Sequence, residues 1–531
     1  MTTLATPAAA TAAGAIGLYP AASFRVTTGG DRDAPAIPQA LWYFRAETIA
    51  VPRPGLPVAG FARGTGAFAD VRAWAATWRE CTPPDYPPLV WIAAPAVVRH
   101  ARLLPDRDAL AAGDGELPCT LVPRIALNRS YFDASSRAFF AARRVTARGS
   151  AAPAAFAVRT LWPDDFRLGG AAPPARALPA GASAAARMRA LMREAPRGGA
   201  DSPFAAWTLW QRDEAATDWT GQPVLALMVN GAQGDDDEAH AGHFALVTGR
   251  VAADGAIGDW LVANFYTLDT ESEKGIVAAP VPLDNYLADL NSGQAWYRPS
   301  CLLVAVLRDE RAAALVQGAV NRVYNQFYRH QLDYYHPTQN CTSISVDTLR
   351  TLGWPVPARG ATSAVGAWLA YPFVALAKRS LARAATAFDY QRTDLTRLLP
   401  AVALEDAFAS LWALVHGDGP ADGGALARML AEDVAALAYL RVPQLPSSRA
   451  WGDAPAVSLA EYRARVPRDP ALVQAVPVPA RPFPAALRDA DLLPRAARPS
   501  DRANAAWGAL ALVGLPYLLW RAWRRRRDRA R

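Results

Sequence analysis

The chain has 531 residues, which is more than one ordinary hydrophobic core accommodates and indicates two or three domains. Hydrophobic residues make up 52% of it and charged residues 20%, a balance that excludes a disordered protein. The net charge of +8 is concentrated in residues 521–531, where seven Arg and one Asp give +6. The remainder carries only about +2, which argues against nucleic-acid binding by the body of the protein.

The first 203 residues divide into three stretches by composition. Residues 1–35 are rich in Ala, Thr and Gly, and we expect them to be loose. From 36 to 170, short apolar runs alternate with Pro and Gly turns, a pattern that predicts a strand-rich accessory domain. Residues 171–203 have the composition of a linker, with one helix predicted over 184–194.

A second domain is predicted over 204–360. Apolar runs at 224–229, 243–251, 259–266 and 300–307 predict strands. Residues 310–329 predict a helix, and 342–352 predict another that ends at Gly353, a residue suited to a helix C-terminus.

The C-terminal part is predicted to be mostly helical over 361–442, followed by a Pro-rich extended connection over 443–503 and a membrane anchor over 504–531. The sixteen uncharged residues 505–520 would span about 24 Å as a helix, slightly short of a hydrocarbon core of about 30 Å. Trp507 and Trp520 stand where interfacial aromatic residues are found, and the Arg cluster indicates a cytoplasmic end. The alternative is a buried C-terminal helix with a solvated basic tail.

A cytoplasmic tail implies a body on the periplasmic side of a bacterial inner membrane, and such a body needs an export signal. Residues 1–22 contain no Lys or Arg and only a mild apolar run, so they do not resemble a signal peptide. The other interpretation is an interfacial anchor on the cytoplasmic face. We expect the periplasmic arrangement.

The four cysteines are too few for a disulfide scaffold, and the absence of a CxxC pair argues against structural zinc. Cys81 and Cys119 could form a disulfide if the body is exported. Cys341 differs from the others because it follows Asn340 at the start of a predicted helix. A helix N-terminus and a nearby imidazole lower a thiol pKa, and the thiolate is the nucleophile.

The imidazole would come from His243, which follows Gly242 at the start of a predicted strand. By themselves these residues also fit a small buried thiol and a structural histidine. Their order and context add to the argument. The run 243–247 (HFALV), the run 261–264 (LVAN) and the run 335–343 (YHPTQNCTS) together resemble the circularly permuted papain-like thiol enzymes. That group includes relatives of the NlpC peptidoglycan peptidases, lecithin:retinol acyltransferase and several bacterial periplasmic proteins.

The resemblance covers about a third of the chain, from 204 to 357. It implies an α+β fold in which an antiparallel sheet packs with helices, and in which the histidine precedes the cysteine. It also implies that Cys341 is the nucleophile, His243 the general base and Asn264 the residue that orients the imidazole. Backbone N–H groups at the start of the cysteine helix would stabilise an oxyanion.

Three alternatives stay open. A one-residue slip in strand register would replace Asn264 by Thr267 or Asp269. His336, five residues before the cysteine, is a rival base. His240 and His243, beside an acidic loop at 235–238, could ligate a divalent metal, although this spacing lacks the helical i, i+4 face of zinc hydrolases. We expect no metal and no cofactor.

Together these features predict a membrane-tethered bacterial cysteine hydrolase or acyltransferase. Its substrate would be an amide or ester of the cell envelope, either in peptidoglycan or in an acyl lipid. The rival hypothesis is a non-catalytic envelope scaffold that keeps the fold and binds a partner. The two differ in whether the Cys341 thiol is accessible and ionised near neutral pH.

Overall fold

The computed structural model describes residues 14–34, 36–53, 60–79, 88–121, 132–194, 203–231, 241–270, 275–361, 363–420, 423–446, 456–465, 468–469, 479–510 and 515–529. Sheets and helices are mixed along these ranges, and the chain is an α+β protein as the sequence predicts.

The centre of the molecule is a seven-stranded antiparallel sheet in the order β11-β17-β16-β12-β13-β14-β15. Its strands are β11 (Ala205–Gln211), β12 (Pro223–Asn230), β13 (His243–Arg250), β14 (Leu261–Asn264), β15 (Ala279–Pro282), β16 (Ser300–Leu307) and β17 (Val434–Val442). Strands β12, β13 and β16 are almost wholly buried, because helices and neighbouring segments pack over the sheet. Their near-continuous apolar sequences follow from that burial.

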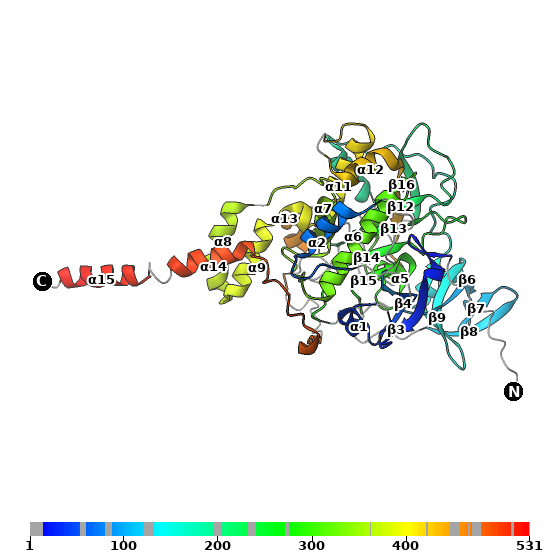
Figure 1. Cartoon of the computed structure of the whole chain (residues 1–531), viewed down its shortest axis with the longest axis horizontal. Coiled ribbons are helices and arrows are strands. Elements are labelled where there is room, and N and C mark those ends of the chain that lie inside the picture. The colour runs from blue at the N-terminus through cyan, green and yellow to red at the C-terminus, as the bar shows by residue number, and fades with distance from the viewer. Residues whose placement is uncertain are drawn as a thin grey trace.

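Helices α6 (Arg311–Tyr328), α7 (Cys341–Thr351) and α11 (Pro400–Val415) pack against β12 and β13 (Figure 1). Around them lie α4 (Ala184–Met192), α5 (Leu283–Ala288), α10 (Leu395–Leu398), α12 (Ala425–Asp433) and α13 (Leu459–Arg465). The helices α4, α6 and α7 lie where the sequence predicts them, within two or three residues at each end.

The accessory region contains a closed five-stranded barrel in the order β10-β8-β7-β6-β9. It is built from β6 (Ala96–Leu103), β7 (Ala109–Ala112), β8 (Gly115–Leu121), β9 (Val145–Ala151) and β10 (Phe156–Pro163), with α3 (Ala134–Ala141) against β6. Closure removes exposed strand edges, and the strands surround buried apolar side chains such as Val145 and Val158. This region is strand-rich, as the sequence predicts.

The N-terminal residues that the structure describes are ordered into strands, although the sequence predicts a loose segment over 1–35. They form the pair β1 (Ala15–Ile16) and β2 (Tyr19–Pro20), and the small sheet of β3 (Phe24–Thr28), β4 (Thr48–Pro52) and β5 (Val90–Trp91). Helices α1 (Pro38–Tyr43) and α2 (Ala67–Thr77) pack against α6. Tyr19 is buried and its hydroxyl accepts a hydrogen bond from Asn321, so tertiary contacts order a segment whose composition looks unstructured.

The stretch 361–442 departs from the predicted helical pattern at its end. Its alanine- and leucine-rich last residues form β17, which pairs with β16 on one side and β11 on the other. The helical preference of Ala and Leu is weak, and hydrogen bonding to a strand on each side outweighs it here.

The C-terminal part consists of α8 (Ala364–Lys378), α9 (Leu381–Arg392), α14 (Pro499–Ala509) and α15 (Leu515–Arg529). They lie at the end of the molecule opposite the barrel, and α15 points away from the body (Figure 1). The sequence predicts one anchor helix over 504–531, but the structure has two shorter helices, with 511–514 outside the described residues. None of the helices in the described ranges is long and apolar enough to cross a membrane.

Candidate functional site

Cys341 is the first residue of α7, and the residues around it fix the start of that helix. The Asn340 side chain accepts hydrogen bonds from the backbone N–H groups of Thr342 and Ser343, at 2.9 and 3.0 Å. The Ser343 hydroxyl accepts in return from the Asn340 N–H at 2.8 Å, which completes a capping box. The Cys341 N–H lies outside this box. Of the first three N–H groups of the helix, that of Cys341 is therefore the one we expect to stabilise an oxyanion, since those of Thr342 and Ser343 are bonded to the cap.

His243 is the first residue of β13, and its ring is held by Asn264 at the end of β14. Leu246 pairs with Ala263, so His243 and Asn264 are diagonal neighbours on one face of the hairpin. The His243 Nε2 lies 3.0 Å from Asn264 Oδ1, while Asn264 Nδ2 donates to the Val277 carbonyl at 2.8 Å. The sequence leaves the register of this hairpin open, and the structure has the register in which these two side chains meet.

These contacts determine the tautomer of the imidazole. The Val277 carbonyl can only accept, so the Asn264 amide nitrogen must face it and the amide oxygen must face the histidine. That oxygen also only accepts, so the proton of the neutral imidazole is on Nε2. The lone pair is then on Nδ1, the nitrogen available to accept a proton.

Cys341 packs against the beginning of the strand that carries this imidazole. The backbone N–H of Phe244, the residue after His243, donates to the Cys341 thiol, and the Thr342 hydroxyl lies 3.8 Å from the sulfur. The positive charge of Arg298, just before β16, also acts on both the thiol and the imidazole. No sequence pattern points to Arg298. The sheet brings it to the site because β16 and β13 both flank β12.

All three predicted site residues are buried, with exposed fractions of 5% for Cys341, 5% for His243 and 2% for Asn264. Burial raises the pKa of the Cys341 thiol, although the Phe244 N–H, the Thr342 hydroxyl and Arg298 oppose this. Burial, aided by Arg298, lowers the pKa of His243 to about 3, against the effect of Asn264. The sequence predicts a lowered thiol pKa. In the structure the largest effect on the thiol is burial, which raises its pKa, so the direction is opposite to the one predicted.

A second layer of polar groups supports the histidine. The Tyr286 ring of α5 lies 6.4 Å from the His243 ring, between centroids, and its hydroxyl donates to Asn230 Oδ1 at 2.6 Å. Asn230, which pairs with His243 across β12 and β13, donates in turn to the Ser300 hydroxyl at 2.6 Å. Helix α5 and strands β12 and β16 are therefore connected beside the site by buried side-chain hydrogen bonds.

The rival residues make contacts of their own, although His336 lies near enough to His243 for the two imidazoles to act on each other. His336 bonds through Nδ1 to the Tyr390 hydroxyl at 2.8 Å, and burial together with His243 lowers its pKa to about 4. Its backbone carbonyl accepts from the Asn340 side chain at 2.7 Å, so it helps to hold the loop before Cys341. Thr267 accepts from the Asp269 N–H at 3.3 Å, and Asp269 acts on Tyr43 and His330 instead of His243.

The metal hypothesis and the disulfide fall partly outside the described residues. His240, the acidic loop at 235–238 and Cys81 lie there. Within the described ranges, no three His, Cys, Asp or Glu side chains gather into a group that could hold a metal ion. Cys119, Cys301 and Cys341 are free thiols.

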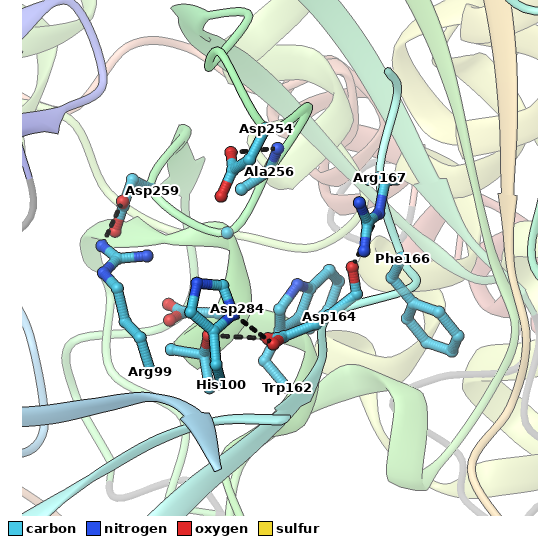
Figure 2. Close-up of a pocket in the computed structure, with 12 residues that line it drawn as sticks. Arg99, His100, Trp162, Asp164, Phe166, Arg167, Asp254, Ala256, Asp259 and Asp284 are labelled. Carbon is cyan, nitrogen blue, oxygen red and sulfur yellow. Dashed lines mark hydrogen bonds and ion pairs between the residues drawn. The ribbon is translucent and has the colours of Figure 1, made fainter. Parts of the chain in front are cut away.

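A separate pocket lies where the barrel meets the β13–β14 hairpin and α5 (Figure 2). Its walls include Arg99 and His100 of β6 and Asp259 of the hairpin. Arg99 pairs with Asp259 at 2.9 Å, and His100 Nδ1 lies 2.8 Å from Asp164. Beside it, the buried Arg148 joins Asp259 and Asp284 at 3.0 and 2.6 Å. The two arginines pair with carboxylates of the hairpin and of α5, so these ion pairs link the barrel to the sheet.

Comparisons of the chain with protein-family models, with curated proteins and with solved structures find no match.

Proposed function

We propose that this protein is a thiol hydrolase or acyltransferase of the permuted papain-like class, with Cys341 as nucleophile and His243 as general base. The observation that carries the proposal is the joint placement of the two residues. The thiol is bonded to the backbone of the strand that begins with His243, and Asn264 holds that imidazole with its lone pair on Nδ1. Sequence order and the Asn-Cys-Thr context support the same assignment.

In the proposed reaction, the Cys341 sulfur attacks the carbonyl carbon of an amide or ester while His243 Nδ1 takes the thiol proton. The carbonyl electrons move to oxygen, and the Cys341 N–H stabilises this charge. When the intermediate collapses, the C–N or C–O bond breaks and the imidazolium gives its proton to the leaving amine or alkoxide. Water or a second acceptor then takes the acyl group from sulfur and restores the thiol.

A neutral thiol–imidazole pair suits this mechanism. The thiol proton moves to the imidazole as the sulfur attacks, so the buried site does not have to hold a thiolate–imidazolium ion pair before the substrate reacts. The positive charge of Arg298 stabilises negative charge on sulfur, and it also lowers the basicity of His243, so it does not by itself drive the proton from the thiol to Nδ1. We propose an envelope substrate, either a peptidoglycan amide or a lipid acyl ester, and a bacterial inner-membrane location with the body on the periplasmic side. No cofactor takes part in this mechanism.

The burial of the site supports one alternative, a non-catalytic scaffold that keeps this fold. An exposed fraction of 5% and a raised pKa at Cys341 are also what an inert thiol would show. The two proposals differ in whether Cys341 accepts an acyl group.

The test is acylation of the full-length protein by p-nitrophenyl esters of short and long acyl chains, followed by mass spectrometry of the cysteine peptides. We expect the acyl group on Cys341 with release of p-nitrophenolate. His243→Ala should slow this by about 10²- to 10⁴-fold, the usual contribution of a general base.

Cys301 provides the matched control, because it is also a buried free thiol, and burial raises its pKa to about 12. Cys301→Ser should leave the rate unchanged, whereas Cys341→Ser should remove the thioester. Equal labelling of both cysteines, insensitive to His243→Ala, would refute the enzymatic proposal and favour the scaffold.

A further inference from the structure

Helix α8 has an apolar outer face that no other element of the described structure covers. Its exposed large side chains are Val365, Leu369, Phe373 and Leu376, with exposed fractions of 70%, 71%, 74% and 79%. They recur at intervals of four, four and three residues and therefore form one stripe along the helix. Leu381, at the start of α9 and 68% exposed, continues the apolar surface.

The inner face of α8 packs the helix against the rest of the C-terminal part. Ala367 and Tyr371 are buried in a small cluster with Phe388 of α9 and Ala503 of α14. The fifteen residues of α8 include only one charged side chain, Lys378 at the last position. A helix that is apolar all round is normally covered on all sides, by protein or by lipid. The outer stripe therefore indicates a surface that is covered when the protein is in place.

The charges around the stripe indicate what covers it. Lys378, Arg379 and Arg383 are exposed at the turn between α8 and α9. The helix α14 packs on α9 and α8, and α15 follows it with exposed Tyr517, Trp520 and Trp523. Five exposed arginines, at 521 and 524–527, lie on α15. Apolar and aromatic side chains next to dense positive charge are typical of helices that lie in the interface of an anionic bilayer.

We propose that the outer stripe of α8, continued by Leu381 and bordered by the positive charges at the turn between α8 and α9, is a binding surface for an anionic lipid bilayer, to which the basic helix α15 adds further positive charge. The helix is about 22 Å long, shorter than the hydrocarbon core, and its stripe runs along its length, so it lies in the surface plane. The inference builds on the membrane location in the proposed function and extends it to a surface outside the C-terminal helices.

This surface is connected to the cysteine loop by hydrogen bonds. Asp389 of α9 accepts from the Ser500 N–H and hydroxyl of α14, at 2.6 and 2.8 Å, and from the Tyr335 hydroxyl at 3.0 Å. The next residue, Tyr390, bonds to His336, whose carbonyl holds the Asn340 cap. Docking through α8 therefore holds the segment leading to Cys341 close to the lipid surface.

The test is flotation of the full-length protein with vesicles of phosphatidylcholine, alone or mixed with phosphatidylglycerol. We expect binding to the mixed vesicles and a decrease with salt. The double substitution Leu369→Glu and Phe373→Glu should weaken binding about a hundredfold, because each side chain contributes about tenfold when buried in lipid. Both side chains are exposed, so the thermal unfolding temperature should not change.

Val26→Glu is the matched control, since Val26 is an exposed apolar residue (51%) on β3, outside this surface. Replacing the five α15 arginines by Gln should weaken the preference for phosphatidylglycerol, and replacing Lys378, Arg379 and Arg383 as well should remove it. Flotation of the double variant equal to the wild type would overturn the proposal. The proposal would also be overturned if the wild-type protein formed a dimer without lipid and the double substitution abolished that dimer, because the stripe would then bind a second copy of the chain. Flotation does not require Cys341, so this outcome is independent of the acylation test.

Discussion

The hydrogen bond between His243 and Asn264 gives a prediction for both stability and acylation. Asn264→Ala leaves two buried groups without their partner, the His243 Nε2–H and the Val277 carbonyl. An unsatisfied buried polar group costs about 1–3 kcal/mol, so the free energy of unfolding should fall by about 2–6 kcal/mol. Urea denaturation of the two proteins measures this difference.

The same substitution should slow the acylation of Cys341. Without the Asn264 oxygen, the imidazole is no longer confined to the tautomer with its lone pair on Nδ1, and its orientation is less fixed. The loss of one positioning bond worth about 1.4–2.8 kcal/mol corresponds to a rate decrease of about 10- to 100-fold. The assay is p-nitrophenolate release under conditions in which the variant remains folded, followed as a function of pH.

Asn264→Asp separates orientation from a general loss of structure. The carboxylate keeps the acceptor for His243 and adds a negative charge, which raises the pKa of the imidazole. Acylation should therefore recover toward the wild-type rate at high pH, with its acid limb moved to higher pH. The reasoning fails if Asn264→Ala acylates at the wild-type rate while His243→Ala does not, because the base would then need no orienting residue.

Three further predictions concern stability. Arg148→Ala should lower the free energy of unfolding by about 3–5 kcal/mol in urea titrations, since it leaves the buried Asp284 unpaired. Arg107→Ala removes an exposed ion pair and should leave the urea midpoint nearly unchanged, so equal shifts for the two variants would contradict this reasoning. Asn340→Ala should cost about 1–2 kcal/mol by the same measurement, because two N–H groups lose their cap, and an unchanged midpoint would refute the role of the capping box. His243 becomes protonated below pH 6.5 in the unfolded chain but only near pH 3 in the folded chain. This group should therefore lower the free energy of unfolding by about 1.4 kcal/mol for each unit by which the pH decreases within that window. At pH 5, unfolding of His243→Gln should bind about one proton fewer than unfolding of the wild type. If the two proteins showed the same slope of stability against pH, His243 would not be buried in its neutral form.

Much of the candidate site follows from local sequence. Asn340, Cys341 and Ser343 define the start of α7 through short-range capping, and Gly353 after its end has φ +90°, a conformation that favours glycine. The apolar run over 243–251 predicts β13 for an equally local reason. These are interactions among residues a few positions apart, so they can be predicted without the rest of the chain.

Other features depend on residues distant in sequence. The last part of 361–442 contains Ala and Leu that suit a helix, and it becomes β17 only because β11 and β16 offer two edges to pair with. Closure of the barrel and the ordering of the N-terminal strands also depend on contacts between residues that are distant in sequence. The proximity of Arg298 to Cys341 and His243 follows from strand order in the sheet, which no spacing in the sequence encodes.

The sequence by itself determined the elements that begin at Cys341 and His243, because capping and hydrophobic periodicity act over one or two turns or along one strand. Only the tertiary structure decided the protonation states of those two residues. Burial of the thiol and imidazole depends on the packing of α7 against β13, and the resulting desolvation raises the pKa of the thiol and lowers that of the imidazole. The apolar stripe on α8 is a tertiary result as well, since the sequence gives its periodicity but only packing shows which face remains exposed.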